Sequence, residues 1–219
     1  MTSPAVRTYH HGDLRRALID EGLQLARTGG PGAVTLREAT RAVGVSPNAA
    51  YRHFADRDAL VHAVAHGAQR ALADAILAHV AETPAGLSPR DAAIERLRRV
   101  GAGYIAFART ERGWFETAFF THDAQPSEGI VTLDDEIVAP FRLLMDTLDA
   151  MVDAGALAPD RRPFAEWACW SAVHGFADIA VHGPVRWQPP EVVDALAAGV
   201  VESAITGVIG APAPPPRTS

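Results

Sequence analysis

The chain has 219 residues, of which 48% are hydrophobic and 21% charged, a composition typical of packed globular proteins. Its single cysteine, Cys169, excludes an internal disulfide and fits a reducing cytoplasm. We find neither a signal-peptide core nor an apolar run of about 20 residues, so we expect a cytoplasmic protein that does not enter the membrane.

The formal net charge is −6, but the charge is unevenly distributed. Residues 1–80 contain nine arginines against seven acids, together with six of the nine histidines. Residues 81–219 contain eleven arginines against nineteen acids. A basic head on an acidic body is attracted to phosphate through one face only, so the modest asymmetry favours a nucleic-acid contact near the N-terminus.

We predict an all-α fold of about nine helices without a strand. Residues 1–9 are expected to form a flexible arm, and the proline-rich residues 210–219 a disordered tail. Between them we predict a three-helix domain over residues 10–55, a long connecting helix over 56–80, and a second helical domain over 88–209.

Caps, glycines and prolines predict where most of these helices begin and end. Asp13 is expected to cap the first helix, and Asp56 the connecting helix. Pro140 is expected to bend a helix that Gly155 ends. Outside the motif described next, the predicted ranges are 13–28, 57–80, 88–110, 114–120, 133–154, 162–182 and 191–209.

Residues 35–54 have the pattern of two short helices joined by a sharp turn. Thr35 and Glu38 form a T-x-x-E capping box, which predicts a helix start. Gly44 ends this helix because glycine tolerates a left-handed backbone. Ser46 is expected to cap the next helix, with Pro47 at its first position. A linker of two residues forces the helices to cross sharply, which indicates a helix-turn-helix.

The run VTLREATRAVGVSPNAAYRHFADRDAL (residues 34–60) resembles the DNA-binding domain of the tetracycline-repressor (TetR) family in residue type and spacing over about 25 positions. In the second domain, Trp170, His174 and Gly175 of WSAVHG match the W-x-x-x-H-G signature of one subgroup of that family. The resemblance implies a transcriptional regulator whose second domain binds a ligand and dimerises.

In a helix-turn-helix, the second helix enters the major groove and its N-terminal residues reach base edges. The Asn48 amide can pair with an adenine edge, and Ala49 can touch a thymine methyl. Tyr51 is also compatible with structural packing, and His53 with a solvated helix position. The full set of candidate DNA contacts is Thr35, Ser46, Pro47, Asn48, Ala49, Tyr51, Arg52, His53 and Arg57.

Aromatic residues are frequent in the second domain. They are compatible with an ordinary helical core, but a cavity between helices uses the same residue types with a few polar groups among them. The resemblance favours a cavity. The candidate ligand contacts are Tyr104, Phe107, Trp114, Phe119, Phe141, Met145, Trp170, His174 and Asp178.

One helical stripe offers a second interpretation, because residues four apart share a face. It consists of Glu166, Trp170, His174, Asp178 and His182, and H-x3-D-x3-H is compatible with a metal site. A polar pocket lining or a buried hydrogen-bonded pair explains the same residues. The polar loop residues His122, Asp123 and Glu128 fit a solvated loop.

The last helix has a wide apolar face, so we expect a homodimer through the last two helices. A two-fold dimer prefers a palindromic operator in double-stranded DNA. We therefore expect a repressor released by a small-molecule effector, with neither enzymatic activity nor a cofactor. A ligand-independent DNA-binding regulator and a metal-dependent helical enzyme are the alternatives.

Overall fold

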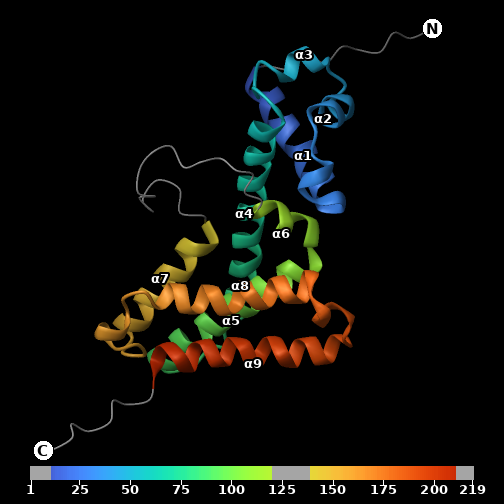
Figure 1. Cartoon of the computed structure of the whole chain (residues 1–219). Coiled ribbons are helices and arrows are strands. Elements are labelled where there is room, and N and C mark those ends of the chain that lie inside the picture. Colours follow the sequence, from blue (N-terminus) through green and yellow to red (C-terminus); the bar gives the residue numbers. More distant parts are fainter. Residues whose placement is uncertain (1–10, 120–138, 211–219) are drawn as a thin grey trace, which may run out of the picture. The chain divides into compact units, whose positions relative to one another are not determined.

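The computed structural model describes residues 11–119 and 139–210, without the side chains of residues 11–13. Nine α-helices and two short 3-10 helices make up this part of the chain, and no strand occurs in it, as predicted (Figure 1). The predicted residues Phe120, His122, Asp123 and Glu128 lie outside the described ranges. The described residues divide into two compact units: residues 11–69 with 111–119, and residues 70–110 with 139–210.

The first unit begins with α1 (His11–Ala33), which is interrupted near its end. Gly30 has φ 61° and ψ −166°, which a non-glycine residue adopts rarely, so the regular helix breaks there. The break agrees with the glycine-rich stop predicted after residue 28. The predicted start was wrong, because α1 begins two residues before Asp13 and this residue therefore cannot be its N-cap.

Three further helices complete the first part of this unit: α2 (Leu36–Val43), α3 (Pro47–Ala50) and the start of α4 (Arg57–Ala81). The predicted Asp56 cap of α4 is confirmed, since the Ala59 amide donates to Asp56 Oδ1 at 2.8 Å. Side chains from all four helices form one core, which buries Leu18, Val34, Leu36, Ala39, Ala50, Phe54, Leu60 and Val64.

The short helix α6 (Arg112–Ala118) belongs to this first unit and packs against α1. A Cβ atom at Gly113 would lie 2.1 Å from the Ala26 carbonyl oxygen, so only glycine permits the approach. The Trp114 indole donates to the Leu23 carbonyl at 2.7 Å. This segment was predicted to belong to the second domain, because nothing in its local pattern indicates that it contacts α1.

The second unit is a helical bundle of α5 (Pro89–Thr110), α7 (Ala139–Asp153), α8 (Ala165–His182) and α9 (Pro190–Ile209). Residues 70–81 of α4 also belong to it. Helix α5 contacts α7, α8 and α9, while α8 and α9 lie side by side and antiparallel (Figure 1). The 3-10 helix η1 (Pro159–Arg161) precedes α8, and η2 (Pro184–Trp187) connects α8 to α9.

Specific residues define the ends of these helices, including Gly155, which was predicted to end one of them. The Asp91 amide donates to Ser88 Oγ at 3.1 Å, and Gly155, at φ 66°, follows α7. Phe164 at the N-cap of α8 is a non-glycine residue at φ 65°. Pro140 is the second residue of α7, and the preceding segment of the predicted bent helix lies outside the described residues.

Helix α9 is more apolar than the sequence analysis allowed. By length and composition alone it could cross a membrane. Its most apolar stretch has a mean hydropathy of 1.8, and 22% of that stretch is buried. The expectation that no such run exists was therefore wrong. One such helix is weak support for a membrane span, since a helix that packs against protein meets the same criteria.

Candidate DNA-binding and ligand-binding sites

The turn between α2 and α3 is built by Gly44. This residue has φ 78° and ψ 30°, the left-handed conformation predicted for it. Its amide donates to the Arg41 carbonyl at 3.3 Å, and the Val45 amide donates to the Thr40 carbonyl at 3.0 Å. These two bonds close a Schellman motif, which satisfies the last carbonyls of α2 and redirects the chain within two residues.

The start of α2 confirms one half of the predicted capping box. Thr35 Oγ1 accepts from the Glu38 amide at 3.2 Å. The Glu38 carboxylate forms an ion pair with Arg41, on the next turn of the helix. The Thr40 hydroxyl, which is buried, donates to the Leu36 carbonyl at 2.8 Å. Local hydrogen bonds therefore define both ends of this helix.

Helix α3 is shorter than the second helix of the predicted motif. Ser46 occupies the predicted N-cap position in an extended conformation, with Pro47 as the first helical residue, but its side chain forms no capping hydrogen bond. Helical bonding continues one turn beyond α3, because the His53 and Phe54 amides donate to the Ala50 carbonyl at 2.8 and 2.9 Å. Ala50 and Phe54 are buried and fix this segment on the core.

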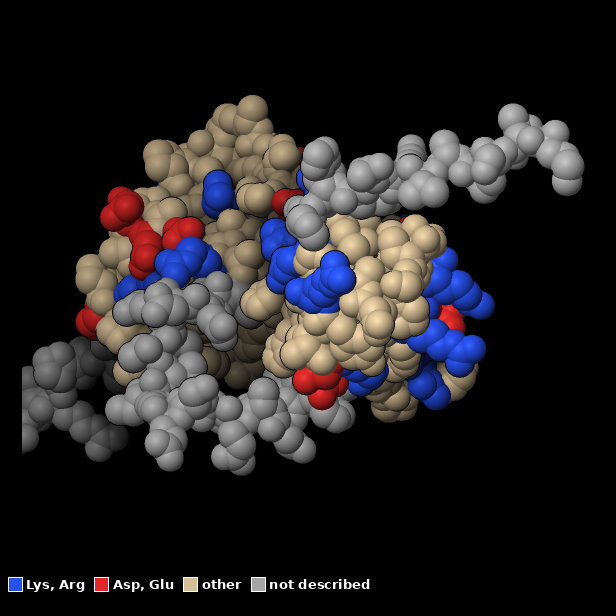
Figure 2. Space-filling view, turned by 90° about the horizontal axis from the view of Figure 1, so that it is seen from above, with Lys and Arg blue, Asp and Glu red and all other residues tan. Residues whose placement is uncertain are grey.

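The outer surface of α3 consists of small and polar side chains. Ser46, Pro47 and Asn48 are exposed and Ala49 is half-buried. Tyr51 is 57% exposed although it is large and aromatic. In Figure 2, blue arginine patches lie on either side of an uncharged surface of the first unit, where red acidic patches are fewer. Such a surface suits a polyanion whose groove must be approached closely.

The basic side chains of this unit differ in their partners. Arg52 is exposed, as is Arg37 near the start of α2, and neither forms an ion pair with another described residue. Arg37 was not among the predicted DNA contacts. Its position, two residues after the Thr35 cap, places it on the exposed first turn of α2. His53 is half-buried.

Arg57 has a structural role that its sequence position did not indicate. Its Nε donates to the Val34 carbonyl at 2.9 Å, and its Nη2 donates to the Pro31 carbonyl at 2.6 Å. The guanidinium therefore ties the first residue of α4 to the segment that joins α1 to α2. Its contact with DNA phosphate stays a prediction. The main-chain amides at the start of α4 are further candidates for this contact, because helix N-termini attract anions.

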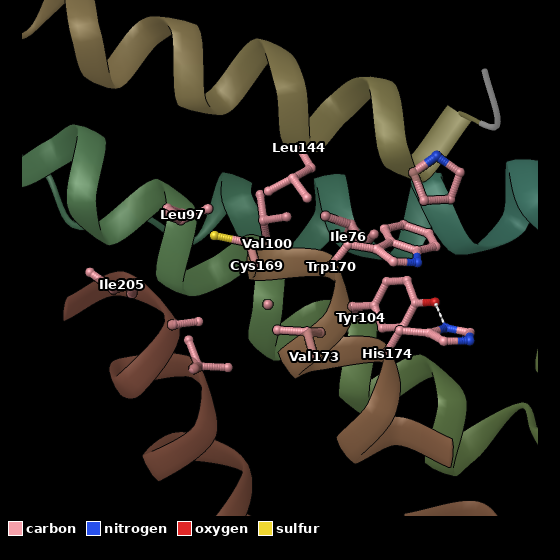
Figure 3. A pocket seen from close by; sticks show the side chains of 14 residues that line it. Ile76, Leu97, Val100, Tyr104, Leu144, Cys169, Trp170, Val173, His174 and Ile205 are labelled. Atoms are coloured by element: carbon pink, nitrogen blue, oxygen red, sulfur yellow. Dashed lines mark hydrogen bonds between the residues drawn. The ribbon is translucent and has the colours of Figure 1, made fainter. Parts of the chain in front are cut away.

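The second unit contains a cavity between α4, α5, α7, α8 and α9 (Figure 3). It has about 440 Å³ of empty space including its mouth. None of the lining residues is an arginine or an acid. They are Ile76, Leu97, Val100, Gly101, Tyr104, Pro140, Leu144, Cys169, Trp170, Val173, His174, Val201, Ala204 and Ile205.

A hydrogen-bonded pair forms the polar part of the lining. The Tyr104 hydroxyl lies 2.6 Å from His174 Nδ1, as the dashed line in Figure 3 shows. Burial raises the pKa of Tyr104 and lowers that of His174 below its usual value of 6.5, although Asp178 opposes the latter shift. Trp170 stacks on His174 with ring centroids 5.6 Å apart and meets Tyr104 edge-on at 5.3 Å.

Three of the nine predicted ligand contacts, Tyr104, Trp170 and His174, line this cavity together. Phe141 lies behind the lining, with its ring 5.2 Å from that of Trp170. Trp114 lies in α6 and Phe119 follows it, so both belong to the first unit. The other three, Phe107, Met145 and Asp178, are not among the lining residues.

Most of the lining was missed because it consists of ordinary apolar residues from separate helices. One local signal could have found part of it. Gly101 interrupts a helical pattern, where glycine costs about 1 kcal/mol relative to alanine, so a packing reason is expected. A Cβ atom there would lie 3.0 Å from a methyl group of Val201 and 3.5 Å from one of Val173, both across the cavity region.

The polar stripe of α8 does not converge on one point. Glu166 pairs with Arg162 at 2.6 Å, and Asp178 pairs with His182 at 2.8 Å on the surface. His174 instead contacts Tyr104 on α5. Within residues 11–119 and 139–210, no group of three or more His, Cys, Asp or Glu side chains is arranged to hold a metal ion.

Comparisons with known proteins agree with this architecture. The profile of bacterial regulatory proteins of the tetR family matches residues 18–64, and the tetracyclin repressor-like C-terminal domain matches residues 97–204. Among curated proteins, none matches the sequence significantly. The two profiles cover the helix-turn-helix and most of the bundle. The fold and these matches define a transcriptional regulator, and the chain belongs to the TetR family.

Solved structures show the same fold at low sequence identity. A Rhodococcus sp. RHA1 protein of unknown function has a TM-score of 0.70 at 23% identity, covering 94% of this chain and 100% of that one. A tetR-family regulatory protein from Rhodococcus RHA1 has a TM-score of 0.55 at 17% identity, with 91% and 98% covered. A TetR variant from Acinetobacter baumannii AYE, in complex with minocycline, has a TM-score of 0.53 at 19% identity, with 89% and 97% covered.

Proposed function

We propose that this regulator binds a specific DNA operator through α3 and is released from it by a small molecule. The observation that carries the proposal is the outer surface of α3, where Ser46, Pro47 and Asn48 are exposed ahead of Tyr51. Small side chains let a helix approach base edges closely, and an amide can pair with adenine. In this arrangement Asn48 reads a base, and Ala49 contacts a thymine methyl group.

Phosphate contacts hold the reading helix in register. Tyr51 and Arg52 extend from the C-terminal side of α3, Thr35 precedes α2, and His53 follows α3. Hydroxyl and guanidinium groups are common phosphate partners, which position a protein on the duplex without reading its sequence. Arg57 acts mainly by holding the residues before α2 in place. The main-chain amides at the start of α4 attract phosphate directly.

A second copy of the chain covers the exposed apolar surface of α8, η2 and α9. Large apolar side chains that are 40% exposed or more are concentrated between residues 164 and 196: Phe164, Trp167, Ile179, Trp187, Val192 and Leu196. Exposed apolar surface of this extent marks an interaction site. A two-fold dimer through the last two helices pairs two α3 helices with two half-sites of a palindrome, about 34–36 Å apart.

The cavity of the second unit holds the effector in this proposal. A ligand shifts a regulator between two states only by binding one of them more tightly. The similar TetR variant from Acinetobacter baumannii holds minocycline, which is a small molecule of this kind. The W-x-x-x-H-G residues Trp170 and His174 line the cavity here, which supports the subgroup assignment. We propose a cytoplasmic repressor that the effector inactivates.

Selection of binding sites from a random pool of double-stranded DNA tests the proposed DNA recognition. We expect one palindromic sequence to be enriched, with half-sites about one helical turn apart and one dimer bound per site. A pool that remains random after selection, while DNA is still retained at low salt, would show phosphate attraction only.

Leu196→Glu tests the dimer surface, because Leu196 is 44% exposed on α9 and contributes little to the core of one chain. We expect this variant to sediment as a folded monomer with weakened operator binding. Arg142→Glu, at an exposed position of α7, is the matched control and should remain dimeric. A Leu196→Glu dimer of unchanged affinity would place the interface elsewhere.

A further inference from the structure

We infer that the cavity of the second unit selects an uncharged aromatic ligand that carries a hydroxyl group, and that Tyr104 and His174 recognise this hydroxyl. This inference rests on the proposed ligand response and adds to it the chemical class of the ligand. Three features of the cavity carry it: the absence of charge in the described lining, the neutral polar pair, and the aromatic frame around that pair.

Charge is missing from the described lining of the cavity. Of its fourteen residues, Tyr104, Cys169, Trp170 and His174 have side chains with hydrogen-bonding atoms, and the other ten are aliphatic residues, proline or glycine. Transfer of an ion from water into such surroundings is costly unless a counter-charge accompanies it. A carboxylate or ammonium ligand would find no counter-charge among these residues.

Two carboxylates that act on lining residues also oppose an anion. Burial, together with the smaller effect of the Glu166 carboxylate, raises the pKa of the Cys169 thiol to about 11. Asp178 acts on the His174 ring in the same sense. Both carboxylates have partners outside the lining, Glu166 in Arg162 and Asp178 in His182, so a cationic ligand gains little from either.

The Tyr104–His174 pair is suited to a hydroxyl group. Burial keeps the Tyr104 hydroxyl protonated and the His174 ring neutral near pH 7, so the pair has no net charge. A hydroxyl oxygen donates one hydrogen bond and accepts others at the same time. A ligand hydroxyl can therefore bond to this pair in either direction, while a hydrocarbon of the same shape can form no hydrogen bond with it.

Aromatic rings define the shape of the space around this pair. Trp170 lies nearly parallel to the His174 ring, at an interplanar angle of 12°, while Tyr104 and Phe141 meet Trp170 edge-on at 72° and 73°. Figure 3 shows Tyr104, Trp170 and His174 together, with the aliphatic residues Val100, Leu97 and Ile205 farther along the cavity. Flat apolar molecules fit such a frame.

Binding of four probe molecules to the full-length protein tests the inference without DNA. The probes are phenol, toluene, benzoate and benzylamine, which share one ring and differ in polarity and charge. Isothermal calorimetry measures affinity, and Trp170 in the lining supplies a fluorescence signal. We expect phenol to bind about three- to tenfold more tightly than toluene. Benzoate and protonated benzylamine should bind at least about a hundredfold more weakly than phenol.

Tyr104→Phe removes the hydroxyl and keeps the ring, so it should reduce the preference for phenol over toluene to nearly one. His182→Asn is the matched control, because this histidine is on the same helix and pairs with Asp178 outside the cavity. It should keep the wild-type preference. If Tyr104→Phe fails to fold, the order of the four probes on the wild-type protein still decides.

Benzoate or benzylamine binding as tightly as phenol would overturn the inference, and so would no binding by phenol. A phenol preference that survives Tyr104→Phe would overturn the recognition by Tyr104. The proposed regulatory function fails differently. Phenol could bind in the expected order and leave operator affinity unchanged, which would retain the ligand class for this cavity and refute the release of DNA by that ligand.

Discussion

The helix-turn-helix and the cavity differ in how their residues are distributed along the chain. The first site is formed by residues 34–57, where each helix end is defined by hydrogen bonds between near neighbours such as Thr35 and Glu38. The second site takes side chains from five helices between Ile76 and Ile205. The first can be recognised from adjacent residues, whereas the second exists only after the bundle has packed.

Helix α6 is the exception that makes this comparison instructive. It lies more than 80 residues from its partners on α1, yet Arg27 donates to both carboxylate oxygens of Glu111, at 2.7 and 2.6 Å, next to the Trp114 contact. The DNA-binding unit therefore also depends on tertiary packing. Substitutions in the two sites can measure how far each depends on local and on distant contacts, beginning with the largest expected effect.

Gly113→Ala tests the distant contact of the first unit. An added methyl group would lie 2.1 Å from the Ala26 carbonyl oxygen, so α6 must move away from α1. We expect the free energy of unfolding to fall by about 2–3 kcal/mol, measured by chemical denaturation. Gly32→Ala is the control, because nothing lies within 4 Å of its added Cβ atom, and it should change stability by less than about 0.5 kcal/mol. Equal effects of the two substitutions would show that α6 does not support this unit.

Asn48→Ala and Arg52→Ala separate base reading from phosphate contact at the local site. Both side chains are exposed, so the fold should be unchanged. Asn48→Ala should weaken operator binding by about 1–3 kcal/mol and relax the choice of base at one position. Arg52→Ala should weaken binding to all sequences alike. It should also reduce the slope of the logarithm of affinity against the logarithm of salt concentration by about one, as expected for the loss of one phosphate contact. Anisotropy titrations on single-base operator variants distinguish the two results, and a reversed pattern would mean that the roles are exchanged.

Thr35→Ala and Ser46→Ala compare two N-cap positions of the same motif. Thr35 accepts a hydrogen bond from the Glu38 amide, whereas the Ser46 side chain forms no capping bond. Thermal or chemical unfolding should show a loss of about 1 kcal/mol for Thr35→Ala. Ser46→Ala should cost less than about 0.5 kcal/mol. A larger loss at Ser46 would contradict the geometry at the start of α3.

His174→Gln addresses the cavity and has the smallest expected effect. Burial holds the pKa of His174 in the folded protein below its usual value of 6.5. The unfolded chain therefore binds a proton more readily, so His174 weakens the folded state as the pH falls below about 6.5. We expect the stability advantage of the wild type over His174→Gln to decrease between about pH 7.5 and pH 5.5. Urea denaturation at several pH values measures this difference, and an advantage that grows on acidification would contradict a buried neutral ring.

The same contrast explains how much could be predicted from the sequence. Gly44, Pro47 and the Asp56 cap each act on their own neighbours, so the all-α fold, the helix-turn-helix and the start of α4 were predicted correctly. Ser46 shows the limit of such reasoning, because its sequence position identifies a cap site while the side-chain rotamer decides whether a bond forms.

The cavity was predicted in part, through the residues that carry polarity or aromatic rings. Tyr104, Trp170 and His174 stand out in the sequence for chemical reasons, and they do come together. Trp114 stands out equally and packs on α1, since an aromatic residue looks the same in a core and in a cavity. Apolar lining residues such as Val201 depend on the packing of α5 against α9, which no local pattern records.

Binding of the selected operator by the wild-type protein tests the central claim most directly. Fluorescence anisotropy at about 50 and 200 mM salt would compare this duplex with a scrambled duplex of the same composition. We predict that binding to the operator survives the higher salt and an excess of scrambled competitor, with two chains per duplex. Equal affinity for both duplexes, lost together at the higher salt, would contradict sequence-specific recognition by α3.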